Sequence, residues 1–128
     1  MLKLFYDPDI SYLEIFFKKT PNYGIDLNST IIEFRSELND EIVGYGIHRP
    51  DKAIPSLTFI PPKVKIAVIC FMRRKEKGLS EKEVAAKLGM SYRTYQRIEE
   101  GQISKIDDLL KISKFISNLD FSQLLKVS

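Results

Sequence analysis

Two short helices joined by a tight turn are the feature that most limits what this chain can fold into. Ser80 stands three residues before Glu83, which is the spacing of a capping box, and opens an amphipathic stretch that stops at Gly89. Ser91 follows almost at once as the cap of a second helix, which stops at Gly101. The spacing therefore predicts a pair of helices separated by a turn of three or four residues.

The second helix of this pair carries many long polar side chains near its start. Scattered Lys and Glu would be enough to solvate a short helix, and a plain amphipathic helix remains the alternative interpretation. The side chains present here are instead of the kinds that reach base edges and phosphates in a DNA groove. They are Tyr92, Arg93, Thr94, Gln96 and Arg97.

The stretch LSEKEVAAKLGMSYRTYQRIEEG resembles the helix-turn-helix of Cro and phage repressors. Ten of its residues agree with the pattern of that family: Leu79, Glu83, Ala85, Lys87, Leu88, Gly89, Ser91, Ile98, Glu99 and Gly101. The resemblance implies a five-helix domain that places its second helix in the major groove of double-stranded DNA. It also implies that Tyr95 and Ile98 pack inward on Val84 and Leu88.

The same resemblance implies a set of DNA-contacting residues. Most lie at the start of the second helix, and two more lie at the start of the first. The set is Ser91, Tyr92, Arg93, Thr94, Gln96, Arg97, Ser80 and Lys82. Glu81 departs from the family pattern, since it replaces a glutamine that contacts phosphate, and Glu100 replaces a residue that is often basic. These carboxylates leave open an alternative, a protein-interaction module that keeps the scaffold without reading DNA.

Charge is divided unevenly along the chain. The first sixty residues carry six Lys or Arg and nine Asp or Glu, whereas residues 61–128 carry fourteen and eight. The net charge is thus −3 in the first part and +6 in the second, which makes the C-terminal part the candidate for binding a polyanion. Arg73–Lys77 is a basic run that suits either a solvated helix end or a phosphate contact.

The N-terminal part reads as β structure. Residues 2–6 and 12–17 alternate around a turn that starts at Asp7, and residues 30–38 and 42–47 alternate around Asn39 and Asp40. In the third run we expect Ile32, Phe34 and Leu38 to face the core. The segment 18–29 is rich in Pro, Gly and Asn, which is typical of a loop. The pattern predicts four antiparallel strands.

This N-terminal part also resembles a family of short β-rich bacterial domains of unknown function, over about residues 4–54. The residues that agree are Tyr6, Asp7, Pro8, Tyr12, Ile15, Val43, Gly44 and Ile47. A small domain of this kind joined to a repressor-like helix-turn-helix is similar in architecture to the HicB-like antitoxins. In that architecture one domain neutralises a small toxin protein and the other represses the shared operon.

Prolines between residues 50 and 62 place a domain boundary near residue 60. We expect a β-rich dimerisation or partner-binding domain over 1–58 and a helix-turn-helix DNA-binding domain over 61–128. Its helices would start near Lys63, Ser80, Ser91, Ser104 and Phe121. The fold class is then α+β. Because the β segment has no helix of its own to cover its apolar face, the helical part or a second copy must do so, which predicts a homodimer.

The sequence gives little support for catalysis. His48 is the single histidine and suits a surface or turn position, and the apolar surroundings of Cys70 predict a buried thiol. Asp7, Asp9 and Glu14 could form a carboxylate group, but Asp-Pro-Asp is ordinary turn chemistry, so a metal-dependent hydrolase is only a third hypothesis. We predict no catalytic residue, no metal and no cofactor.

The sequence as a whole predicts a sequence-specific DNA-binding transcriptional regulator, and the resemblance to HicB-like architecture implies an antitoxin that represses its own operon. No apolar run reaches the roughly 20 residues that a membrane span needs, and the first ten residues lack the basic and apolar regions of a signal peptide. A single cysteine fits a reducing compartment. We therefore expect a cytoplasmic protein without membrane contact.

Overall fold

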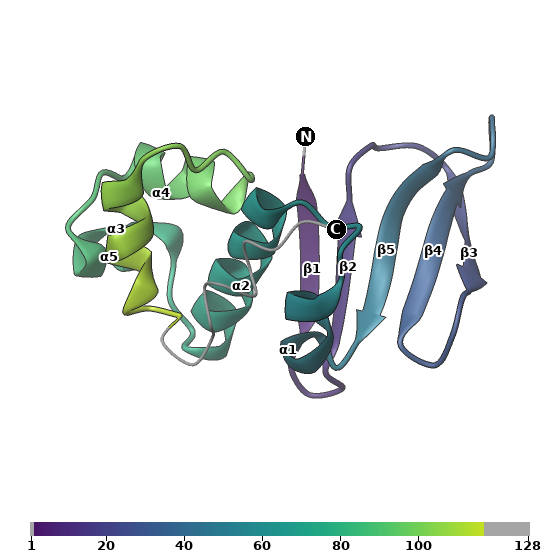
Figure 1. The fold of residues 1–128 in the computed structure, drawn as a ribbon, viewed down its shortest axis with the longest axis horizontal. Helices are drawn as coiled ribbons and strands as arrows, with labels where there is room; N and C mark the ends of the chain where they lie inside the picture. The colour runs from purple at the N-terminus through teal and green to yellow at the C-terminus, as the bar shows by residue number, and fades with distance from the viewer. Residues whose placement is uncertain (1, 117–128) are drawn as a thin grey trace. The chain divides into compact units, whose positions relative to one another are not determined.

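The computed structural model describes residues 2–116 and consists of two compact units, Met1–Ala53 and Ile54–Ser128. The first is built on a β-sheet and the second is helical (Figure 1). The chain is therefore a mixed α+β protein. The division between the units falls ahead of the boundary that the prolines predict near residue 60.

The first unit contains one antiparallel sheet. Its strand order is β1-β2-β5-β4-β3, so the last strand in the chain lies in the middle of the sheet (Figure 1). Among the described residues the strands are β1 (Lys3–Asp7), β2 (Tyr12–Phe16), β3 (Asn22–Asp26), β4 (Ile31–Ser36) and β5 (Ile42–His48).

The prediction of four strands was wrong by one, because β3 lies in the segment that we interpreted as a loop. The segment can form a strand because β3 is at the edge of the sheet and pairs only with β4. Pro21 comes just before the strand, where the missing N–H costs no ladder bond. Gly24 lies opposite Phe34, and a Cβ there would be 3.2 Å from the Phe34 ring. The residues typical of a loop are thus compatible with an edge strand.

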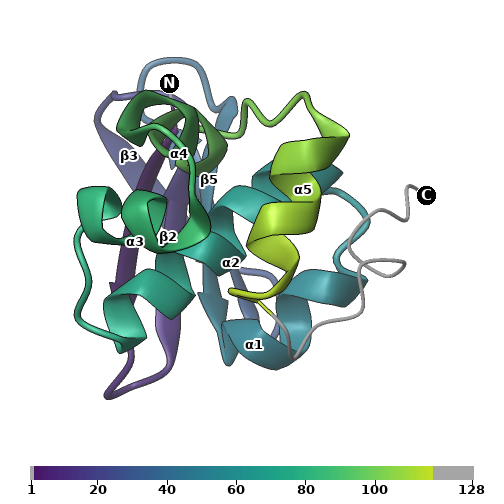
Figure 2. The same cartoon turned by 90° about the vertical axis from the view of Figure 1, so that its left-hand side faces the viewer.

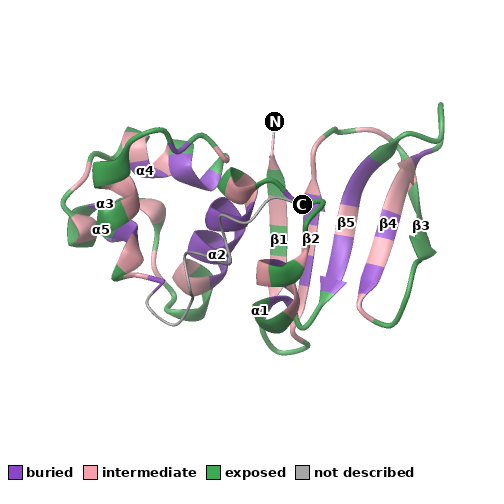
Figure 3. Cartoon of the chain, in the orientation of Figure 1, coloured by how far each residue is buried: buried purple, intermediate pink, exposed green. Residues whose placement is uncertain are grey.

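The sheet has an aliphatic face and an aromatic face. The aliphatic face carries buried residues of the three central strands: Leu13, Ile15, Ile31, Val43 and Ile47. The alternate residues form the opposite, aromatic face, on which Phe16 lies 5.0 Å from Phe34 and Tyr12 lies 5.0 Å from His48 between ring centroids. Figure 3 shows the buried positions concentrated on the central strands.

The core side predicted for β4 was wrong. Ile32 and Phe34 belong to the aromatic face, Leu38 is 79% exposed, and Glu33 on the aliphatic side is only 7% exposed. Glu33 tolerates this position because the Arg35 Nε donates to its Oε1 at 2.6 Å. Since Ile31 and Ile32 are both apolar, the alternation fits either side, and a slip of one residue exchanges the faces.

Two glycines on β5 let the aromatic rings lie close to the sheet. A Cβ at Gly44 would collide with the carbonyl oxygen of Ile15 and lie 2.7 Å from the Phe16 ring, and one at Gly46 would meet the hydroxyl of Tyr12. Both glycines are buried, and they lie opposite Phe16 and Glu14 of β2. The absence of side chains on β5 therefore shapes the aromatic face.

Short helical turns follow the sheet, in the segment whose prolines marked the predicted domain boundary. α1 (Pro50–Ala53) ends the first unit, and a 3-10 turn, η1 (Ile54–Ser56), starts the second. Pro50 occupies the first position of α1, which a proline tolerates because the N–H of that position has no helical partner.

The second unit contains four α-helices among its described residues (Figure 2). They are α2 (Pro62–Glu76), α3 (Glu81–Leu88), α4 (Tyr92–Glu99) and α5 (Ile106–Ser113). α2 has prolines at its start and a buried run from Lys65 to Met72, so it is the central helix of the unit. The fifth helix predicted, near Phe121, lies outside the described residues.

The start predicted for the fourth helix was wrong by one residue, since Lys105 and not Ser104 directly precedes it. α5 begins at Ile106 after Lys105, and Ser104 lies in the loop before it, where it lines a cavity. No side chain caps the first turn of α5. Asp107 and Asp108 lie in that turn, where the helix dipole favours negative charge.

Gly44→Ala is expected to destabilise the sheet by about 1–3 kcal/mol, because the added methyl group forces the Phe16 ring and the neighbouring backbone apart. Urea unfolding followed by circular dichroism measures the loss. The exposed Glu37→Ala in the β4–β5 turn is the control and should unfold like the wild type. Equal midpoints for the glycine variant and the control would contradict this account.

Candidate nucleic-acid interface

Local hydrogen bonds fix the first turn of each helix in the predicted pair. The Glu83 backbone N–H donates to Ser80 Oγ and the Ser80 N–H donates to Glu83 Oε1, each at 3.1 Å, which completes the predicted capping box. On the second helix the Thr94 N–H donates to Ser91 Oγ at 3.1 Å. Each serine is therefore the N-cap residue that its spacing indicated.

The turn between α3 and α4 depends on Gly89. Its φ of 68° is in the left-handed region that glycine adopts without strain, and the N–H of the next residue, Met90, donates to Ala85 O at 3.0 Å. The Lys111 Nζ donates to Gly89 O at 3.2 Å, which ties α5 to the same turn. The turn is thus held from inside the motif and from a neighbouring helix.

The inner side of α4 is apolar and buried. Tyr95 and Ile98 are almost completely buried, as is Val84 on α3, and α4 packs against both α2 and α3. The prediction that Tyr95 and Ile98 point inward is confirmed by this burial. Burial also raises the pKa of the Tyr95 phenol, so the side chain stays neutral inside the unit.

The outer side of α4 presents most of the side chains that the sequence singled out. Tyr92, Arg93 and Arg97 are exposed, and Thr94 and Gln96 are partly exposed. Ser80 and Lys82 are exposed at the start of α3. The structure therefore brings the predicted residues to the surface at the start of α3 and on the first two turns of α4.

Some of these side chains are already engaged with one another. The Lys82 Nζ lies 5.3 Å from the centroid of the Tyr92 ring, which connects the start of α3 to the start of α4. The Gln96 Nε2 donates to the Tyr92 hydroxyl at 3.5 Å. The Ser91 hydroxyl donates to Thr94 Oγ1 at 2.8 Å, so these two hydroxyl groups act mainly in capping the helix.

A buried ion pair fixes the far end of α4. The Arg74 Nε and Nη2 donate to the two oxygens of Glu99 at 2.7 and 2.9 Å, and Arg74 Nη1 donates to Leu79 O at 3.2 Å. Glu99 is only 9% exposed. One guanidinium therefore joins α2, the end of the α2–α3 turn and the end of α4.

Sequence reasoning missed Arg74. It occurs in the basic run Arg73–Lys77, for which we weighed only solvent exposure or phosphate contact, whereas its guanidinium is directed inward. Arg73 in the same run pairs with Glu76 at 2.9 Å. The one available signal was Glu99, which matches a structural position of the resembled family and needs a cation when buried.

Glu81, the departure from the resembled pattern, is half-buried at the first position of α3. Burial and the nearby Glu99 carboxylate raise the pKa of Glu81. Glu100 is exposed at the end of α4. Of the two carboxylates, Glu100 is therefore the more available to repel a phosphate.

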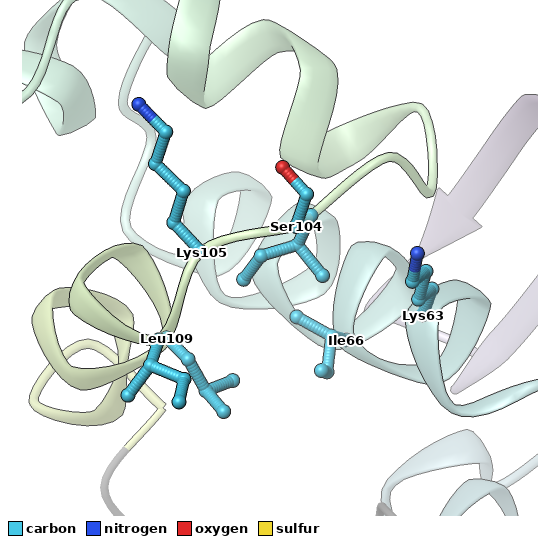
Figure 4. Close-up of a pocket in the computed structure, with 7 residues that line it drawn as sticks. Lys63, Ile66, Ser104, Lys105 and Leu109 are labelled. Atoms are coloured by element: carbon cyan, nitrogen blue, oxygen red, sulfur yellow. The ribbon is translucent and has the colours of Figure 1, made fainter.

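A cavity of about 240 Å³ lies elsewhere in the helical unit, between α2, the α4–α5 loop and α5 (Figure 4). Its lining is mostly aliphatic, with polar groups only from two lysines and a serine. The lining residues are Lys63, Ile66, Ile103, Ser104, Lys105, Ile106 and Leu109. This set lacks the carboxylate, imidazole or thiol groups of a hydrolytic site.

Cys70 and His48, which were weighed for catalysis, belong to different units of the chain. Burial raises the pKa of the Cys70 thiol, which fits the buried position predicted for it, and His48 is exposed at the end of β5. Within residues 2–116, no group of three or more His, Cys, Asp and Glu side chains could hold a metal ion. No helix in this part of the chain is long and apolar enough to span a membrane.

The capped helix pair, its tight turn and the exposed start of its second helix define a helix-turn-helix. Residues 72–124 match the helix-turn-helix family model, over less than half of the chain. The matched segment includes α3, α4 and α5, so the C-terminal unit contains a domain of the type found in DNA-binding transcription regulators. No curated protein and no solved structure matches the chain significantly.

Glu99→Gln is expected to destabilise the helical unit by about 3–5 kcal/mol, because it leaves the buried Arg74 guanidinium without a counter-charge. Thermal unfolding followed by circular dichroism measures the change. Arg74→Met combined with Glu99→Leu should recover much of the loss, since both buried charges are then removed together. Glu100→Gln on the exposed neighbour serves as the control, and a loss of the same size there would contradict the assignment.

Proposed function

We propose that this chain is a sequence-specific, DNA-binding transcriptional regulator that acts as a homodimer in the cytoplasm. The observation that carries the proposal is the outer side of α4, where Tyr92, Arg93 and Arg97 are exposed on a helix capped by Ser91. Arginine reads guanine bidentately and glutamine reads adenine, so Arg93 and Gln96 are the candidates for base contacts.

The remaining residues of the predicted set would position the helix on the duplex. Lys82 and Arg97 carry the charge for phosphate contacts, whereas Ser80, Ser91 and Thr94 are polar groups at helix N-termini, where backbone N–H groups also favour an anion. The net charge of +6 on residues 61–128 supports the same assignment. In a homodimer two copies of α4 would read half-sites about 34 Å apart.

We further propose that the regulator is the antitoxin and autorepressor of a toxin–antitoxin pair. The support is the architecture, a small β-rich domain joined to a helix-turn-helix, together with the N-terminal resemblance described above. In this proposal the first unit mediates dimerisation or binds a small toxin protein.

A protein-interaction module is the second candidate function. Glu100 is exposed at the end of α4, and Ile106 and Leu110 are 75% and 61% exposed on α5. Exposed apolar side chains of this size are typical of protein contacts, and a carboxylate near the recognition surface opposes a phosphate backbone. This candidate requires a stoichiometric protein partner and no enriched DNA on purification from the native cell.

Arg93→Ala and Gln96→Ala are each expected to reduce discrimination between the operator and random DNA by about 1–3 kcal/mol, because each removes a base contact. Binding of the DNA upstream of the gene, measured by fluorescence anisotropy over a salt series, tests this. Lys52→Ala, an exposed charge in the other unit, should leave discrimination unchanged. Equal losses on all sequences would assign both side chains to phosphate, and binding that ignores salt would exclude the regulator.

Co-expression with the product of the adjacent reading frame tests the antitoxin proposal separately. We expect a stable complex that relieves the growth defect caused by the partner alone. A variant with Arg93→Ala and Gln96→Ala together should still form the complex and protect the cell, because the proposed toxin-binding surface lies in the first unit. A partner that is harmless alone, or that does not bind, would contradict this function.

A further inference from the structure

We propose that the aromatic face of the sheet is the surface through which two copies of this chain pair. The inference deepens the homodimer of the proposed function by naming the residues at its interface.

The aromatic face is exposed at the edge strand β1. Alternate residues of a strand project to one side, so Lys3, Phe5 and Asp7 share the aromatic face with Phe16 and Tyr12, which lie opposite Lys3 and Asp7 on β2. Phe5 is 53% exposed. A phenyl ring at this exposure, beside partly exposed aromatic neighbours, is surface that favours an apolar partner.

Charge along β1 makes this surface complementary to itself. Lys3 is basic, Asp7 is acidic, and Phe5 lies midway between them. A two-fold axis that passes through Phe5 across the strands brings the Lys3 end of one copy onto the Asp7 end of the other, and Phe5 onto Phe5. Lys19 adds to the basic end, since it lines a hollow of about 180 Å³ together with Lys3 and Phe16. Lys18 lines the same hollow but pairs with Glu41 at 3.1 Å.

The same charges disfavour single-stranded nucleic acid as the occupant. Aromatic rings on a sheet can stack bases, but a stacking platform needs a basic path for the phosphates. Here Glu14 and Asp26 also project from the aromatic face, in the row that contains Phe5 and Gly46. Carboxylates at this position repel a phosphate backbone. In the pair they lie along the two-fold axis and meet their own copies, so the attraction between copies comes from the Lys3–Asp7 contacts at the two ends and not from this row.

The flatness of the face suits the packing of two sheets. Because Gly44 and Gly46 lack side chains, the rings of Phe16 and Tyr12 lie close over β5 and do not stand upright. Two sheets that pack face to face are separated by about 10 Å, which leaves room for one layer of interdigitated side chains from each. Two copies can therefore meet through their aromatic faces as a sandwich.

Cysteine cross-linking of the full chain tests the geometry. In Phe5→Cys the two thiols face each other across the axis. Backbones about 10 Å apart are too far from each other for a disulfide, so the reagent is a short bis-maleimide, which bridges two thiols at this separation. It should join two chains about tenfold faster than in Leu38→Cys, because pairing raises the effective thiol concentration. Leu38 is exposed in a turn away from this face and is the matched control. Cys70 is buried, and the wild type should not cross-link. Equal rates for the two variants overturn the proposal.

Exchanging the charges of Lys3 and Asp7 tests the pairing while Phe5 is kept. Lys3→Glu and Asp7→Lys should each raise the dimer dissociation constant about three- to tenfold, measured by sedimentation, and the double variant should recover affinity. The two positions are about 13 Å apart along one strand, so recovery must come from pairs between copies. Asp7 also accepts a bond from the Asp9 N–H, and damage to that turn would not be rescued by Lys3→Glu.

The outcomes separate this inference from the proposed function. A wild type that is monomeric at micromolar concentration overturns the pairing while operator binding can still be measured. A dimer that cross-links through Phe5→Cys but binds no DNA supports the pairing and removes the regulator. Binding of oligothymidine by a monomeric chain, lost in Phe5→Ala, would reassign the face to nucleic acid.

Discussion

The bidentate pair between Arg74 and Glu99 is the interaction on which the helix-turn-helix depends. It joins residues that are 25 positions apart, and the same guanidinium also holds the carbonyl of Leu79, the residue before the N-cap of α3. Local caps decide where α3 and α4 begin, but a cap does not orient a helix relative to its neighbours. A buried charge pair with fixed geometry does so, because any other orientation leaves a charge unpaired in the interior.

This constraint explains why one helix can be both firmly held and open on its outer side. Tyr95, Ile98 and Glu99 are the inward groups of α4, and each is buried. Arg93 and Arg97, which are exposed in the first two turns, therefore take no part in this packing. Since the position of the helix does not depend on them, they can be exchanged to alter recognition while the fold is preserved.

Sequence reasoning predicted the parts of the fold that local chemistry specifies. Ser80 with Glu83, Gly89 and Ser91 each act within four residues, so their spacing alone located α3, the turn and α4. Arg74 was missed because its partner is distant in sequence. β3 was missed because an edge strand accepts the Pro and Gly that otherwise mark a loop, and the side of β4 was misassigned because two adjacent isoleucines satisfy either alternation.

Gly44 and Gly46 show a similar dependence in the sheet. They belong to β5, yet they determine the shape of a surface whose side chains come from other strands. The rings belong to β2 and β4, yet they can lie close to the backbone only because Gly44 and Gly46 of β5 have no side chain. A comparison of related chains restricted to the visible rings would miss the cause of their arrangement. Replacing either glycine would alter the shape of that face, although the sequence would keep every aromatic residue.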